Sequence, residues 1–303
     1  MSDLLNNLFG RRDEIEGEDS SSPGTSDLPT QPYVSGDQKP QMSPIPSKPF
    51  LTGIGSSVGM QRDHNEDSLF AMTTNLISNS ASIPMGLYIV ADGMGGHVYG
   101  EKASELAIQA MVNHVLPELI PPSLGLITDF REEQIEEIMT AGIRSAHQSI
   151  QQNAPGGGST LTGLLVLGNK MAIAHIGDSR AYHFEADHDP QVLTTDHSLV
   201  KRLEDLGQIT SDEAAIHPQR NVLYRALGQV EQVDADIIST TKPSSGYLTV
   251  CSDGLWGAVS DLDMLTIIIN AASPQQASEL LLEAANKAGG PDNISVIIIK
   301  IPD

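Results

Sequence analysis

The segment Leu87-Tyr-Ile-Val-Ala-Asp-Gly93 places five apolar residues directly before an Asp-Gly pair. A short apolar run that ends in a turn signal is typical of a buried β-strand, so we expect a strand over 87–91. This strand would leave the Asp92 carboxylate at the edge of the hydrophobic core. A carboxylate in that position costs free energy unless it is paired or coordinated. The segment therefore predicts a buried sheet with a candidate ligand at its end.

The same arrangement recurs along the chain. Four aspartates lie at or beside the end of an apolar strand candidate: Asp92, Asp178, Asp253 and Asp292. A further acidic pair, Glu66-Asp67, lies four residues after Arg62. Carboxylates gathered at one rim repel unless a cation lies between them, and oxygen ligands select hard ions such as Mg²⁺ or Mn²⁺. A single Asp-Gly after a strand is usually only a turn, so the pattern by itself is suggestive.

Strands and helices are predicted throughout the chain after residue 50. We expect a hairpin of strands over 161–167 and 171–184 across the turn 168–170, and further strands over 247–251 and 294–301. Helical spacing of apolar residues predicts helices over 103–114 (ended by Pro117), 135–146, 199–206 and from Ser273 to Gly289. Hairpins combined with paired helices favour antiparallel sheets with segregated helices.

Composition excludes several classes of protein. The 303 residues carry 17 Lys+Arg and 39 Asp+Glu, a formal charge of −22, which argues against a surface for nucleic acid or anionic lipid. The single cysteine, Cys251, permits neither an intramolecular disulfide nor a cysteine-based zinc site. No apolar run is long enough to span a membrane, and the first residues lack the features of a signal peptide. We therefore expect a cytoplasmic protein, and its acidic surface fits a monomer.

The first 50 residues differ from the rest. Seven prolines fall between Arg11 and Phe50 among Ser, Thr, Gly, Asp and Glu, without an apolar period. Such a segment buries too little apolar surface to offset its ordering entropy, so we expect a disordered tail over 1–50 and a globular domain over 51–303. Within the tail, the apolar residues of Leu4–Phe9 share one face of a short helix. That segment is either a frayed terminus or a docking segment that folds on a partner.

Eight segments, in order along the chain, resemble the motifs of the PP2C-type (PPM family) metal-dependent serine/threonine protein phosphatases in their bacterial form. They are Arg62-Asp-His-Asn-Glu-Asp-Ser68, Val90-Ala-Asp-Gly-Met-Gly-Gly-His97, Gly158-Ser-Thr-Leu-Thr162, Ala174-His-Ile-Gly-Asp-Ser-Arg-Ala-Tyr182, Leu193-Thr-Thr-Asp-His-Ser-Leu-Val200, Tyr224-Arg-Ala-Leu-Gly228, Cys251-Ser-Asp-Gly-Leu-Trp256 and Gly290-Pro-Asp-Asn-Ile-Ser-Val296. The resemblance covers about 53–301. It implies an α+β fold, a four-layer α-β-β-α sandwich of two antiparallel sheets flanked by helices.

The resemblance also implies two Mn²⁺ or Mg²⁺ ions at one end of the sandwich. Asp92 would bridge both ions and Gly93 would lend its carbonyl oxygen to one of them, while Asp253 and Asp292 would ligate the other. Glu66 and Asp67 would hold metal-bound waters or ligate directly. These assignments make the acidic residues of the motifs the cofactor site.

Catalytic roles follow from the same resemblance. Arg62 would grip the substrate phosphate, since its planar fork suits two phosphate oxygens. His97 would be the general acid for the leaving alkoxide. A metal-bridged hydroxide would attack phosphorus in line, so no cysteine nucleophile is needed.

A weak third metal ion, held by Asp178, is implied by bacterial members. Many of them carry an acid directly after the Ser-Asp-Gly-Leu-x stretch, where this chain has Gly257, and the next acid downstream is Asp261. We therefore expect the third ion to be absent or weaker. The resemblance makes 195–222 a mobile flap beside the site, whose acids either bias which phosphopeptides enter or form a solvated helix face.

The resulting hypothesis is a phosphatase that hydrolyses phosphoserine and phosphothreonine on proteins and reverses a cognate Ser/Thr kinase. One alternative is a pseudophosphatase that only binds phosphoproteins, but such a relative should have lost one of Asp92, Asp253 or Asp292, and all three are present. Another is a phosphatase of anti-sigma-antagonist-type regulators, whose members usually carry sensor domains in front. A phosphatase of small metabolites also stays open at this stage.

Overall fold

The computed structural model describes residues 48–77, 82–95, 98–124, 131–229 and 231–302. These residues belong to one compact unit, Ser43–Asp303. Almost all of the predicted tail over 1–50, including Leu4–Phe9, lies outside the described residues, as does His97. Phe50, at the predicted boundary, is 3% exposed and packs in the core.

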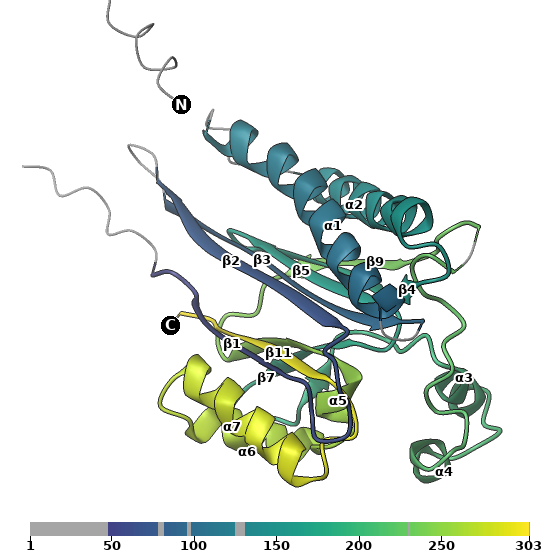
Figure 1. The fold of residues 1–303 in the computed structure, drawn as a ribbon. Helices are drawn as coiled ribbons and strands as arrows, with labels where there is room; N and C mark the ends of the chain where they lie inside the picture. Colours follow the sequence, from purple (N-terminus) through teal and green to yellow (C-terminus); the bar gives the residue numbers. More distant parts are fainter. Residues whose placement is uncertain (1–47, 78–81, 96–97, 125–130, 230, 303) are drawn as a thin grey trace, which may run out of the picture. The chain divides into compact units, whose positions relative to one another are not determined.

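Two antiparallel sheets form the centre of this unit (Figure 1). The first contains, in spatial order, β1 (Leu51–Ser57), β11 (Ile294–Lys300), β10 (Tyr247–Cys251), β7 (Arg180–Phe184) and β8 (Gln191–Val192). The second contains β2 (Asp67–Ile77), β3 (Ser82–Met94), β5 (Leu161–Leu167), β6 (Lys170–Ile176) and β9 (Asp236–Thr241), and β4 (Gly158–Ser159) pairs with the end of β3.

Helices cover the outer face of each sheet (Figure 1). The second sheet is covered by α1 (Val98–Leu124) and α2 (Glu132–Asn153), and the first by α5 (Asp253–Trp256), α6 (Asp261–Asn270) and α7 (Pro274–Lys287). Three buried apolar clusters fill the spaces between the four layers. The predicted α-β-β-α sandwich is confirmed. No helix in the described ranges has the length and apolar character needed to cross a bilayer.

Continuous apolar strands follow from burial on both faces of a sheet. In β3, Tyr88 and Val90 point into the space between the sheets, whereas Leu87 and Ile89 point toward α1 and α2. Successive side chains of a strand face opposite sides, so a strand buried on both sides needs apolar residues at every position. This explains why 87–91 has no polar alternation.

The predicted strand over 171–184 is wrong, because this segment forms two strands in different sheets. β6 ends at Ile176 in the second sheet, and β7 begins at Arg180 in the first. The chain crosses between the sheets at Gly177, whose φ of +104° favours glycine. Apolar content alone does not show such a crossing, since both strands are buried.

The helix expected to stop at Pro117 continues to Leu124. A proline inside a helix removes one backbone hydrogen bond. Val115 and Leu119 on either side are fully buried in the cluster beneath α1. Burial of this apolar face outweighs the lost bond, so the tertiary packing extends the helix.

Two short helices, α3 (Leu199–Asp205) and α4 (Ser211–Ala215), stand apart from the two helical layers (Figure 1). Ser198 and Thr210 precede and cap them, because their side chains accept hydrogen bonds from the first turn. Neither helix contains a buried residue. They form the middle of the segment 195–222, which we call the flap segment.

Candidate metal and phosphate site

The predicted acidic residues gather at one end of the sandwich. β2 starts and β3 ends there, and the two strands place Asp67 opposite Asp92. The chain also leaves β6, leaves β10 and enters β11 at this end. Five aspartates therefore come together from both sheets, and we call them the aspartate rim: Asp67, Asp92, Asp178, Asp253 and Asp292.

A cavity of about 290 Å³ opens at the aspartate rim. Its lining includes Arg62, Glu66, Asp92, Gly93, Asp178, Asp253 and Asp292. Asp67 lies behind it, and its Oδ2 accepts a hydrogen bond of 2.8 Å from the Ser252 hydroxyl. The structure thus brings together every described residue that the sequence predicted for the site, while His97 lies outside the described residues.

Asp92 is held through its backbone. Its N–H donates to Thr160 Oγ1 at 2.9 Å, and its carbonyl oxygen accepts from Thr160 N–H at 2.9 Å and from the Ser159 hydroxyl at 3.1 Å. Gly93 follows, and a Cβ there would come within 2.1 Å of the Gly100 carbonyl oxygen. Sequence reasoning quoted 158–162 as a motif but assigned no role to Ser159 and Thr160, which anchor this strand end.

Asp253 and Asp292 approach the cavity from the first sheet. Asp253 begins α5, and Gly254 after it leaves no space for a Cβ, which would lie 2.0 Å from the Asn293 carbonyl oxygen. Asp292 accepts a hydrogen bond from Asn293 N–H through Oδ1 at 2.8 Å. Its Oδ2 pairs with Arg62 Nη2 at 2.7 Å.

The electrostatics of the rim favour a bound cation. Burial, together with neighbouring aspartates, raises the pKa of Asp67 to about 7 and that of Asp253 to about 6. The pKa values of Asp92 and Asp178 are raised well above the usual range by burial and by nearby aspartates, which for Asp178 are Asp253 and Asp196. Asp67 Oδ1 and Asp253 Oδ1 are buried without a hydrogen-bond partner among the described residues. Lone carboxylate oxygens in an acidic cluster are the donor set that Mg²⁺ or Mn²⁺ takes.

The protein groups at the rim would supply only part of a coordination shell. Within the described ranges, no three His, Cys, Asp or Glu side chains converge on one point closely enough to hold an ion. Mg²⁺ typically keeps several waters and takes one or two carboxylates. The residues present fit that kind of binding, in which backbone carbonyl and water oxygens complete the shell.

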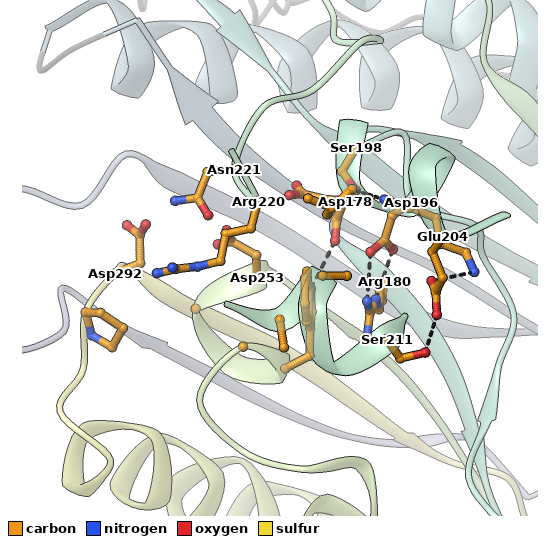
Figure 2. Close-up of a pocket in the computed structure, with 18 of the residues that line it drawn as sticks. Asp178, Arg180, Asp196, Ser198, Glu204, Ser211, Arg220, Asn221, Asp253 and Asp292 are labelled. Atoms are coloured by element: carbon orange, nitrogen blue, oxygen red, sulfur yellow. Dashed lines mark hydrogen bonds and ion pairs between the residues drawn. The ribbon is translucent and has the colours of Figure 1, made fainter. Parts of the chain in front are cut away.

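A second cavity of about 450 Å³ adjoins the first and is lined in part by the flap segment (Figure 2). The two cavities share Arg62, Asp178, Asn221, Asp253 and Asp292. The larger one also takes Ser198, Lys201, Glu204, Ser211 and Arg220 from the flap segment.

Most charges in the larger cavity are already paired. Arg180 donates to both carboxylate oxygens of Asp196 at 2.9 and 2.7 Å (Figure 2). Its guanidinium carbon lies 3.6 Å from the centre of the Trp256 ring. Glu204 accepts hydrogen bonds from Ser211 and Lys201. Arg220 forms no ion pair or side-chain hydrogen bond with the other described residues. It is therefore a cation available to a ligand.

The structure also shows where the residues considered for a third metal ion lie. Asp178 lies at the crossing between the sheets, and its carbonyl oxygen accepts a hydrogen bond of 3.0 Å from Trp256 Nε1. Gly257 lines the larger cavity and brings no carboxylate. Asp261 accepts a hydrogen bond of 3.2 Å from the Tyr182 hydroxyl. The sequence did not predict that Trp256 would contact both Asp178 and Arg180.

Comparison with known proteins shows which family this chain resembles over most of its length. The family model described as Protein phosphatase 2C matches residues 53–294. The chain is 33% identical to the serine/threonine phosphatase Stp of Listeria monocytogenes over 248 residues, which are 80% of this chain and 92% of the relative. It is 34% identical to the protein phosphatase PhpP of Streptococcus pneumoniae over 247 residues, 81% of this chain and 95% of the relative.

Solved structures agree with the sequence relatives. The fold resembles that of the serine/threonine phosphatase of S. agalactiae, with a TM-score of 0.71 and 29% identity over 84% of this chain and all of the other. It also resembles the catalytic domain of the phosphatase PstP in complex with two manganese ions. There the TM-score is 0.67 and the identity 28% over 84% of this chain and 99% of the other.

Proposed function

This chain belongs to the protein phosphatase 2C family, and we propose that its aspartate rim and Arg62 carry out the family's reaction. The protein is a metal-dependent protein serine/threonine phosphatase. The observation that carries the residue assignment is the cluster of aspartates with two buried, unpartnered oxygens, beside a cavity that Arg62 also lines. The binding-only alternative is not favoured, because Asp92, Asp253 and Asp292 are all present at the rim.

We assign the metal ligands residue by residue. Asp92 would ligate both ions. The Gly93 carbonyl oxygen would ligate one of them, and Asp253 and Asp292 would ligate the other. Glu66 and Asp67 would hold waters of these ions or ligate directly. Asp178 would serve a third, weaker ion. Gly257 contributes no carboxylate there, which favours a two-ion enzyme, and Mn²⁺ or Mg²⁺ fits the oxygen donors.

When bound, the two cations lower the pKa of a water molecule and neutralise charge on the phosphoryl group. The chain's own residues orient the reaction. Arg62, which lines both cavities, would hold two phosphoryl oxygens through its planar guanidinium. His97 would donate a proton to the leaving serine or threonine oxygen. The larger cavity would receive the residues around the phosphorylated side chain.

The substrates are phosphoproteins, and we propose that a cognate Ser/Thr kinase supplies them. The acidic chain is expected to act as a monomer. The segment Leu4–Phe9 is retained as a docking segment for a partner. These three proposals rest on the chemistry of the reaction, the net charge and the apolar spacing, respectively.

The direct test is phosphate release from a phosphothreonine peptide. We expect release with Mn²⁺ or Mg²⁺ that stops when EDTA is added and resumes when excess metal is restored. A folded protein that releases no phosphate with either ion would contradict the assignment. Release that persists in EDTA would contradict the role of the aspartate rim.

A further inference from the structure

The loop that carries Arg62 has no regular structure of its own. It spans 58–66 between the end of β1 and the start of β2. Met60 and Gln61 donate their N–H groups to the Gly290 carbonyl oxygen at 2.8 and 3.2 Å. Gln61 Nε2 donates to the Gly289 carbonyl oxygen at 3.1 Å. The loop is therefore fastened to the turn 289–293, which lies about 230 residues further along the chain.

Asn293 fastens both ends of the same loop with one side chain. Its Nδ2 donates to the carbonyl oxygens of Val58 at 2.9 Å and His64 at 2.8 Å, and its Oδ1 accepts from Glu66 N–H at 2.8 Å. Both amide protons are used, and only one orientation of the amide satisfies all three partners. Asn293 is 5% exposed. Few other side chains of this size offer two donors and one acceptor in this arrangement.

The backbone of Asn293 contacts the other side of the site. Its N–H donates to Asp292 Oδ1, and its carbonyl oxygen lies against Gly254, next to Asp253. One buried residue thus joins the loop of Arg62 to two members of the aspartate rim.

We propose that Asn293 is a positioning residue that holds Arg62 at the correct distance from the aspartate rim. The Arg62 side chain is 49% exposed and forms one ion pair, with Asp292, so burial does little to fix it and the backbone of its loop sets where the guanidinium can reach. A phosphoryl group must meet the guanidinium and the metal ions at once, and small displacements of such groups reduce the rate strongly. The proposal rests on the assignment of Arg62 made above.

The test is a double-mutant cycle with Asn293→Ala and Arg62→Ala. The assay uses p-nitrophenyl phosphate at saturating Mn²⁺, with inorganic phosphate as a competitive inhibitor. We expect N293A to raise KM and the phosphate inhibition constant by about 10-fold, with Mn²⁺ affinity by calorimetry changed by less than about two-fold. In the R62A background, N293A should add less than about two-fold, because its effect is transmitted through Arg62.

Two further variants make the experiment specific. Asn286→Ala removes an asparagine whose Nδ2 donates to Ser57 Oγ at the end of β1, outside the loop, and should change KM by less than about two-fold. Asn293→Ser keeps one hydroxyl for the loop and is used if N293A does not fold, which thermal unfolding would reveal. We expect the serine variant to have an intermediate KM.

The outcomes separate the two assignments. If R62A leaves both KM and phosphate inhibition unchanged, the role of Arg62 is wrong, and the role of Asn293 falls with it. If R62A has its effect but N293A costs as much in that background as alone, only the Asn293 proposal is overturned. A large loss of Mn²⁺ affinity in N293A would also overturn it, since Asn293 would then act on the metal ligands.

Discussion

The aspartate rim and the flap segment lie on either side of the same cavities but are stabilised in different ways. The rim is held by buried contacts between distant parts of the chain, such as Asn293 with 58–66. The helices of the flap segment bury no residue, and Leu206 and Ile216 are 63% and 80% exposed. They are stabilised by local caps and surface ion pairs, which contribute little each.

Only the base of the flap segment is firmly attached. His197 N–H donates to the Gly177 carbonyl oxygen at 2.7 Å, and His197 Nδ1 accepts from Gly177 N–H at 3.2 Å. His197 Nε2 lies 3.2 Å from Asp236 Oδ2. Segments with few buried contacts open at low free energy. The difference teaches that the residues proposed for hydrolysis are fixed by packing, whereas the flap helices that line the larger cavity are held by few buried contacts.

The largest effect is expected at the rim. Asp92→Ala should lower kcat on p-nitrophenyl phosphate by at least about 10³-fold at saturating Mn²⁺, because the carboxylate that we assign to both ions is lost. Steady-state kinetics measure this. Asp261→Asn is the matched control, since Asp261 contacts Tyr182 and lies outside the rim, and it should retain activity within about three-fold. Near-normal turnover of D92A would contradict the assignment of Asp92 as a metal ligand needed for hydrolysis.

The flap segment should affect substrate choice more than hydrolysis. Arg220→Ala is expected to raise KM for a phosphothreonine peptide by about 5–10-fold, the loss of one charged contact. It should leave p-nitrophenyl phosphate, which lacks flanking residues, nearly unaffected. Arg202→Ala is the control, since Arg202 lies over the Tyr224 ring and does not line the cavity. Equal losses on both substrates would place Arg220 with the hydrolytic groups instead.

Removal of metal should make stability depend on pH through the rim. In the folded protein the pKa values of Asp67 and Asp253 are raised, mainly by burial, to about 7 and about 6. These two groups therefore favour the folded, metal-free protein most at a pH below the aspartate pKa of the unfolded chain, and this stabilisation is lost as the pH rises through 6–7. Bound cations offset the negative charge of the ionised aspartates. We expect Mn²⁺ to raise Tm more at pH 8 than at pH 5, by about 3–5 °C, in thermal unfolding with and without EDTA. An equal Tm increase at both pH values would argue against these aspartates as ligands.

The smallest effect is expected from residues 1–47, which are part of neither region. Their deletion should leave kcat and KM for p-nitrophenyl phosphate within about two-fold, because β1 and Phe50 remain. A large fall in kcat would mean that the tail completes the site. A change confined to a protein substrate would instead support docking through Leu4–Phe9.

The sequence alone predicted antiparallel sheets with segregated helices, and the family that its motifs resemble predicted the sandwich and the acidic residues that the structure gathers at the rim. Apolar runs that end in Asp-Gly placed Asp92 and Asp253 correctly at strand ends, and the Ser273 cap and Gly289 marked the limits of α7. These features are encoded within a few neighbouring residues. For the same reason, local patterns report them reliably.

Only the tertiary structure decided how these parts meet. Packing sends the chain into the other sheet at Gly177 and carries α1 past Pro117, although the local sequence predicts a continuous strand and a helix end. The bonds of Asn293 join groups 227–235 residues apart. Contacts of that range depend on which buried surfaces pack together, and that choice is made by the whole core rather than by any single segment.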